Sequence, residues 1–83
     1  MILMSRENPD GHKLEELLHT LQEELVVKTN RISNDACPVS QQIVINNHAI
    51  IELLRSAEII QRQSMSALDS LGPNQGPSSP RIG

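Results

Sequence analysis

Apolar residues recur along the chain in two stretches, each with the period of an amphipathic helix. In the first stretch, leucines are spaced four, three and four residues apart, at Leu14, Leu18, Leu21 and Leu25. Acidic and amide side chains occupy the other side of the same turns. This spacing predicts a helix with a leucine-rich seam. Asn8-Pro9 is typical of a helix start, and the turn formers in residues 30–35 favour an end there, so we expect this helix over about residues 9–30.

A second and longer stretch follows Cys37-Pro38, where Pro38 suits the first position of a helix. Ten positions alternate in steps of four and three residues without a break, at Val39, Ile43, Asn46, Ile50, Leu53, Ala57, Ile60, Ser64, Ala67 and Leu71. An average step of 3.5 residues over this length is typical of a coiled coil, so we expect a helix over about residues 38–71. Ile51 and Leu54 widen the apolar stripe, which favours a bundle of four helices over a two-stranded coiled coil.

One segment of the second stretch has an alternative. Residues 43–45 are β-branched and lie between Gln41-Gln42 and Asn46-Asn47, a pattern that also fits a short strand. Outside the two helices, we expect residues 1–8 to be a flexible arm. The composition of residues 72–83, rich in Gly, Pro and Ser, indicates a disordered tail.

The predicted fold is therefore an all-α antiparallel helical hairpin with a coiled-coil-like seam, dimerising into a four-helix bundle. The chain has 83 residues and no Phe, Tyr or Trp, so the hairpin alone has little with which to build a core. Asn46 lies within the seam, and two interpretations of it stay open: a buried asparagine that fixes the alignment of helices by pairing with a polar group, or a hydrated asparagine near the end of the bundle. The predicted interface consists of Leu14, Leu18, Leu21, Leu25, Ile43, Asn46, Ile50, Leu53, Leu54, Ala57 and Ile60.

Charge and composition argue against several classes of partner. The formal net charge is -3, and the seven Lys and Arg residues are scattered, whereas nucleic-acid binding needs a basic patch. The chain has neither an apolar run long enough for a membrane span nor an aromatic belt. With one cysteine, Cys37, no disulfide can form within the chain. We expect no nucleic-acid or membrane partner, and a cytoplasmic or other intracellular soluble location.

Side chains with catalytic or metal-binding chemistry are few. His12 and His19 lie two turns apart with carboxylates between them, but a zinc site needs three or four ligands. Cys37 precedes a predicted helix start, where a thiol pKa can fall, yet no His or Lys is near it in the sequence. We expect no catalytic residue, no metal and no cofactor.

One short segment is similar to a known motif. Ser40-Gln41 matches the first two residues of the Ser-Gln-Glu-Leu-Asp motif in helical hairpins among the sporulation regulators, which dephosphorylate response regulators, while Val44 stands at the position of the Asp. That resemblance implies a hairpin phosphatase, for which Gln41 and Gln42 would supply the amides. The sequence as a whole favours a non-enzymatic module for protein–protein interaction or oligomerisation, such as an adaptor or regulatory subunit. Its expected partner is a second copy or another helical protein, and a small regulator of a signalling or transcription protein is a further alternative.

Overall fold

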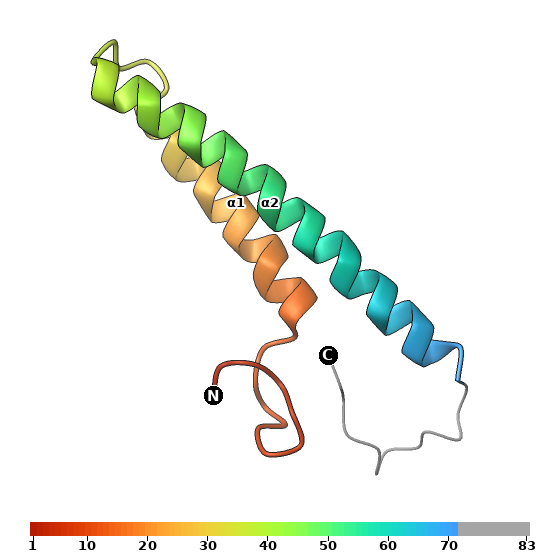
Figure 1. Cartoon of the computed structure of the whole chain (residues 1–83). Helices are drawn as coiled ribbons and strands as arrows, with labels where there is room; N and C mark the ends of the chain where they lie inside the picture. Colours follow the sequence, from red (N-terminus) through yellow and green to blue (C-terminus); the bar gives the residue numbers. More distant parts are fainter. Residues whose placement is uncertain (72–83) are drawn as a thin grey trace.

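The computed structural model describes residues 1–71 and shows two long helices packed side by side (Figure 1). α1 spans Leu14–Ile32 and α2 spans Pro38–Asp69, with the chain reversing direction between them. The all-helical hairpin predicted from the sequence is confirmed. The described residues contain no strand, and residues 43–45 lie inside α2, so the short-strand alternative is wrong. The predicted tail, residues 72–83, lies outside the described residues.

The first helix begins later than its sequence signal indicates. α1 starts at Leu14 rather than near Pro9, and Lys13 precedes it without a side-chain capping bond. Asn8 does not act as a helix cap, because its side-chain amide donates hydrogen bonds to the carbonyls of Met1 and Leu3. Two carboxylates in the first turn of α1 lie near the positive end of the helix dipole and favour the observed start.

The arm before α1 doubles back on itself (Figure 1). The Met4 N–H donates to the carbonyl of His12 at 2.8 Å, and the His12 N–H donates to the carbonyl of Ile2 at 2.9 Å. At Gly11, a Cβ atom would lie 2.7 Å from both the carbonyl carbon of Leu3 and the amide nitrogen of Met4. The close approach of these two backbone segments therefore requires glycine at position 11.

The connection between the helices, residues 33–37, is held by side chains at both of its ends. The Asp35 carboxylate accepts hydrogen bonds from the Cys37 N–H and the Ser40 hydroxyl, each at 2.9 Å. These two bonds, the backbone one first, hold the pKa of Asp35 below its usual value. The Gln41 side-chain amide donates to the carbonyls of Ser33 and Asp35. Asp35 thus satisfies an N–H group at the start of α2 from two residues before the helix cap.

The molecule is one helix thick. Its principal extents are 56 × 23 × 13 Å, and a helix with its side chains is about 10–12 Å across. Ile51, with 7% of its surface exposed, is the one buried hydrophobic residue among residues 1–71. Two helices in a single layer cover only the side that each turns toward the other, so both flat sides of the hairpin remain open.

α2 packs against α1 through a set of positions of which only Leu54 belongs to the predicted interface. We call this set the inner register, and it runs one residue after the predicted seam, at Ser40, Val44, Asn47, Ile51, Leu54, Glu58, Gln61, Met65 and Leu68. All nine residues are buried or half-buried. Four of the nine residues are polar, namely Ser40, Asn47, Glu58 and Gln61.

The α1 side of the contact agrees better with the predicted stripe. Leu14, Leu18 and Leu25 are half-buried, as their spacing predicts, whereas Leu21 is exposed. Thr29, with 2% of its surface exposed, is the most buried polar residue among those described. The hairpin is therefore joined by alternating apolar and polar contacts rather than by a continuous leucine seam.

Candidate interaction surface

The predicted seam of α2 faces solvent in the hairpin. We call it the exposed register, and it consists of Val39, Ile43, Asn46, Ile50, Leu53, Ala57, Ile60, Ser64, Ala67 and Leu71. All of these residues are exposed except Ala57, which is half-buried. The exposed fractions of Leu53 and Ile60 are 70% and 63%. Eight of the ten side chains are apolar, so the more hydrophobic of the two registers is the one left in water.

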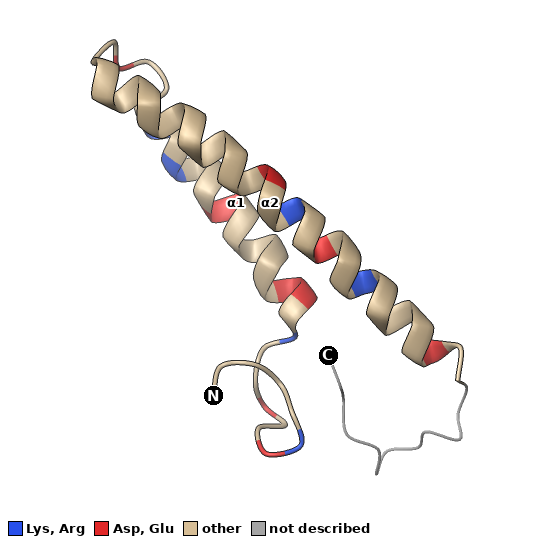
Figure 2. Ribbon diagram, in the orientation of Figure 1, with Lys and Arg blue, Asp and Glu red and all other residues tan. Residues whose placement is uncertain are grey.

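Charged residues are absent from one end of this surface. No Lys, Arg, Asp or Glu occurs in α2 from Pro38 to Ile51, and the ribbon of this part is uniformly tan in Figure 2. Farther along α2, acidic and basic residues alternate through Glu52, Arg55, Glu58 and Arg62 (Figure 2). The exposed register thus begins in a stretch of α2 whose burial would desolvate no Lys, Arg, Asp or Glu side chain of that helix.

The two flat sides of the hairpin differ in chemistry. The contact between His19 and Glu58 joins the helices along one side. Leu17 and Leu21 are each two residues from His19, and at 3.6 residues per turn they lie about 160° around α1 from it. Ala57 lies about 140° around α2 from Arg62, the other ionic partner of Glu58, by the same geometry. The exposed register and the outer leucines of α1 therefore share the side opposite the ionic contacts.

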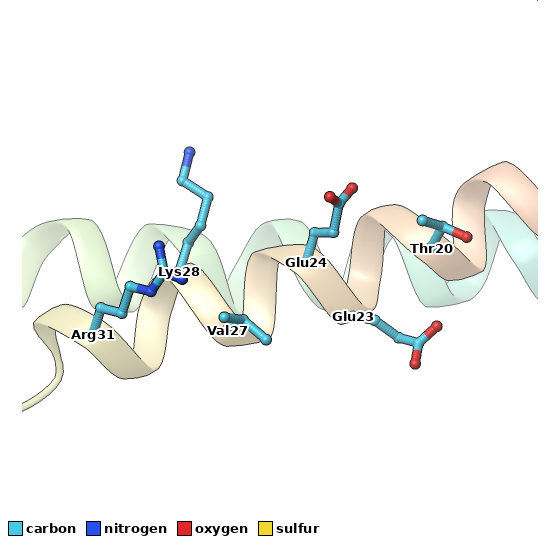
Figure 3. Close-up of a pocket in the computed structure, with 6 residues that line it drawn as sticks. All are labelled: Thr20, Glu23, Glu24, Val27, Lys28 and Arg31. Carbon is cyan, nitrogen blue, oxygen red and sulfur yellow. The ribbon is translucent and has the colours of Figure 1, made fainter.

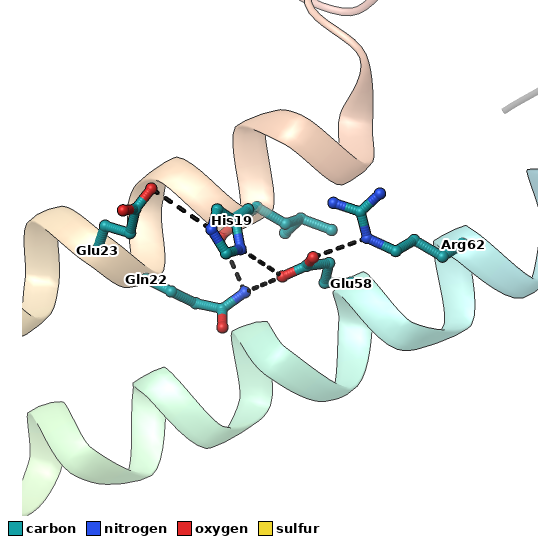
Figure 4. Close-up of polar contacts among 6 residues, drawn as sticks. His19, Gln22, Glu23, Glu58 and Arg62 are labelled. Atoms are coloured by element: carbon teal, nitrogen blue, oxygen red, sulfur yellow. Dashed lines mark hydrogen bonds and ion pairs between the residues drawn. The ribbon is translucent and has the colours of Figure 1, made fainter.

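The ionic side is organised around one carboxylate (Figure 4). Glu58 accepts hydrogen bonds from the Gln22 side-chain amide at 2.7 Å and from Nε of Arg62 at 2.8 Å. Nδ1 of His19 lies 3.2 Å from the same carboxylate, and Nε2 of His19 lies 3.5 Å from Glu23. Because two of the contacts of Glu58 come from α1 and one comes from α2, this carboxylate fixes the alignment of the two helices.

The same contacts determine the protonation of Glu58. Hydrogen bonds from Arg62, then Gln22, and the nearby His19 lower the pKa of Glu58 to about 2. Its side chain is 14% exposed. A carboxyl group that is ionised throughout the physiological range is a poor general acid or base near neutral pH. The chemistry of this cluster is therefore that of a clamp between helices.

A second polar contact lies nearer the loop. The Asn47 side-chain amide donates to the hydroxyl oxygen of Thr29 at 3.1 Å, and that hydroxyl donates to the carbonyl of Leu25 at 2.7 Å. Glu15 and Gln61 are also buried polar residues, on opposite helices near the open end of the hairpin. Polar groups at several levels of the helix contact restrict how the helices can slide, because each needs its partner.

The amides considered for phosphatase chemistry are used within the chain. Gln41 donates to two loop carbonyls, and the side-chain amide of Gln42 donates to Oδ1 of Asn46 at 3.0 Å. Cys37 is exposed and precedes α2, and hydrogen bonds from the backbone of Ser40 and then Val39 lower the pKa of its thiol. No His or Lys lies beside Cys37 in the sequence to act as a base.

Within residues 1–71, no three His, Cys, Asp or Glu side chains gather in a way that could hold a metal ion. Neither described helix combines the length and the hydrophobicity that a crossing of the bilayer requires.

A shallow depression lies on the outer surface of α1. The residues that line it all belong to that one helix, and they are Thr20, Glu23, Glu24, Val27, Lys28 and Arg31 (Figure 3). Their side chains spread outward from a single ribbon, as Figure 3 shows. A site formed by one convex helix cannot enclose a small molecule, so we assign it no function.

The structure divides the predicted interface residues into two groups. Those that are half-buried in the hairpin are Leu14, Leu18, Leu25, Leu54 and Ala57. Those that remain exposed are Leu21, Ile43, Asn46, Ile50, Leu53 and Ile60. Sequence reasoning missed Glu58 and its partners, since only the spatial meeting of residues 36 to 39 positions apart reveals them. The sequence did offer one signal for Glu58. The positions one residue after the predicted seam follow the same 4-3 pattern, and several of them are polar.

Comparison with known proteins gives no assignment. No protein-family model, no curated protein and no solved structure matches this chain.

Proposed function

We propose that the protein is a non-enzymatic protein–protein interaction and oligomerisation module, acting as an adaptor or regulatory subunit. One observation carries the proposal. The more hydrophobic of the two registers of α2 faces solvent, while the register that packs on α1 is interrupted by polar residues. The partner is a second copy of the chain or another helical protein that covers the exposed register.

The proposal follows from the cost of leaving such a surface in water. Ile50, Leu53 and Ile60 lie within about three turns of one another on the exposed register, with 44%, 70% and 63% of their surfaces exposed. Full burial of one such side chain stabilises a protein by about 1.5–3 kcal/mol. Soluble proteins that stay monomeric seldom expose a contiguous apolar patch, and such a patch usually marks a surface that binds a partner.

A layer only 13 Å thick also supports self-association. A two-helix layer of this thickness has no second layer behind it, whereas stable domains pack at least two layers around a core. Stacking a second hairpin on the apolar side would supply that layer and produce a four-helix bundle. The free, exposed Cys37 supports an intracellular, reducing compartment for the module.

Two neighbouring isoleucines offer a matched test. Ile60 belongs to the exposed register, whereas Ile59, 52% exposed, lies about 100° around the helix toward the ionic side. The oligomeric state of the wild type, Ile60→Lys and Ile59→Lys should be measured by light scattering at protein concentrations from about 1 to about 200 μM, so that a dimer with a Kd within or below that range is detected. We expect a dimer or larger species for the wild type and Ile59→Lys, and a monomer for Ile60→Lys.

A wild-type chain that stays monomeric and highly helical across that range would show that the hairpin tolerates its exposed register, and oligomerisation would be rejected. Helicity by circular dichroism serves as the folding control for both variants, because neither isoleucine contributes to the inner register.

A further inference from the structure

We infer that the exposed register binds the same register of a second copy in the antiparallel direction, with Asn46 of one chain opposite Ser64 of the other. This inference rests on the proposed function and adds the identity of the partner, the direction of the helices and their alignment. It follows from the order of side chains along the exposed register and from hydrogen bonds at its two polar positions.

The exposed register is complementary to its own reverse. When its ten positions are paired first with last and so on inward, the pairs are Val39–Leu71, Ile43–Ala67, Asn46–Ser64, Ile50–Ile60 and Leu53–Ala57. The two polar residues meet each other, and each alanine meets a leucine or an isoleucine. An isologous two-fold dimer requires a surface of this kind, on which one patch complements itself.

Hydrogen bonds within the hairpin leave complementary groups at the polar pair. Oδ1 of Asn46 accepts from Gln42, so the Asn46 side chain has its Nδ2 group to donate. The Ser64 hydroxyl donates to the carbonyl of Ile60 at 3.4 Å, so its oxygen is available as an acceptor. In the antiparallel dimer, the Asn46 amide donates to the Ser64 oxygen of the second copy. Each polar side chain of the exposed register thus meets a polar partner in the antiparallel dimer, whereas a shift of one heptad would bury it against apolar side chains.

The parallel arrangement lacks this complementarity. It would place Ala57 opposite Ala57 and Ala67 opposite Ala67, which leaves gaps between the helices. Gaps of this size in an apolar contact destabilise it, whereas large side chains opposite small ones fill the space. The antiparallel pairing removes both alanine–alanine layers.

The area of the apolar side is sufficient for a stable dimer. α1 has 19 residues and is about 28 Å long at a rise of about 1.5 Å per residue. Two helices side by side, each about 10–12 Å across with axes about 8–10 Å apart, present a side about 20 Å wide, which over that length covers about 560 Å² per copy. Two copies stacked on this side bury about 1,100 Å² before surface relief is counted, which is above the roughly 1,000 Å² expected of a specific interface.

Disulfide trapping can test the direction and the alignment together. Cys37→Ser removes the native thiol at an exposed position, and serine is a favourable helix cap. In that background, one chain carries Asn46→Cys and another carries Ser64→Cys. The two chains are unfolded together in urea, refolded as a mixture in a glutathione buffer, and separated by non-reducing electrophoresis and mass spectrometry.

Antiparallel packing predicts that the mixed 46–64 disulfide is the dominant product. In that arrangement two residues at position 46 are separated by 18 positions, about 27 Å along the helix, far beyond the roughly 7 Å between Cα atoms that a disulfide spans. A second mixture, Ile43→Cys with Ala67→Cys, keeps the polar pair intact and should give the 43–67 disulfide. This second mixture guards against loss of dimers through the changes at positions 46 and 64.

The outcomes separate the inference from the function on which it rests. Dominant 46–46, 64–64, 43–43 and 67–67 products in a dimeric chain would overturn the antiparallel alignment and leave the interaction module standing. A chain that is monomeric by light scattering would overturn both. Mixed disulfides in both experiments, absent when Ile60→Lys is added to both chains, would support the inference.

Discussion

Truncation of two adjacent isoleucines should have different effects on stability, because they belong to different registers of α2. Ile51 is 7% exposed and packs against α1, whereas Ile50 is 44% exposed. Ile51→Ala removes about three methyl or methylene groups at about 0.8 kcal/mol each. With the cavity that remains, we expect a loss of about 2.5–4 kcal/mol. A chain of this size has only a few kcal/mol of stability, so this variant should be largely unfolded at low concentration.

Ile50→Ala should act mainly through association. The hairpin already leaves much of Ile50 in water, so the loss within a single chain should be about 1 kcal/mol. In the dimer Ile50 becomes buried, and its truncation should reduce the rise of the unfolding midpoint with protein concentration. The two variants therefore differ both in the size of the effect and in its dependence on concentration.

Urea unfolding at several protein concentrations distinguishes the two effects. Helicity at 222 nm is the appropriate signal, since the chain contains no Trp, Tyr or Phe for fluorescence. Equal losses for Ile50→Ala and Ile51→Ala at every concentration would refute the division of α2 into an inner and an exposed register.

Four further predictions concern other parts of the structure. Leu53→Ala should weaken self-association and lower the unfolding midpoint. Arg55→Ala breaks only an exposed 3.6 Å ion pair with Glu52 and should change stability by about 0.5 kcal/mol. Equal effects of the two variants in urea titrations would contradict the assignment of Leu53 to the associating surface. The pKa of Glu58 is lowered from 4.5 to about 2, so the ionised carboxylate contributes fully to stability above pH 4.5, and this contribution is lost as the pH falls toward 2. Glu58→Gln should remove this part of the acid-unfolding curve, measured by helicity. Thr29→Val should cost about 1–3 kcal/mol by leaving the Asn47 amide without its acceptor, while Thr29→Val combined with Asn47→Leu should recover most of that loss in a double-mutant cycle. Gly11→Ala should open the arm and speed amide exchange at Met4 and His12 without lowering the helicity of α1 and α2; unchanged exchange would contradict the close approach at Gly11.

Local signals in the sequence predicted most of the fold. Pro38 marks the start of α2, and the turn formers near Asp35 mark the reversal, because both effects act within a few residues. The start of α1 differs from the prediction for a local reason as well. Asn8 has the chemistry of a helix cap, but its amide binds carbonyls of the arm, and the helix begins only at Leu14.

The internal contact of the hairpin could not be predicted from periodicity. Two sets of positions in α2, one residue apart, follow the same 4-3 pattern, and hydrophobicity favours the set that begins at Val39. Packing uses the other set because α1 supplies partners for its polar members, such as Gln22 for Glu58 and Thr29 for Asn47. Those partners are distant in the sequence, so a helical pattern assigns Glu58 and Asn47 to solvent.

The short connection held by Asp35 has a consequence for the order in which the chain folds. The contact between Thr29 and Asn47 closes a segment of 18 residues, and that between Gln22 and Glu58 closes one of 36. If the first contact is missing, forming the second costs about 0.6 kcal/mol more in chain entropy, since the segment is twice as long. Folding should therefore begin at the turn and proceed like a zipper toward the arm. The end that carries Met4 and Leu14 is then the last to close and the first to fray.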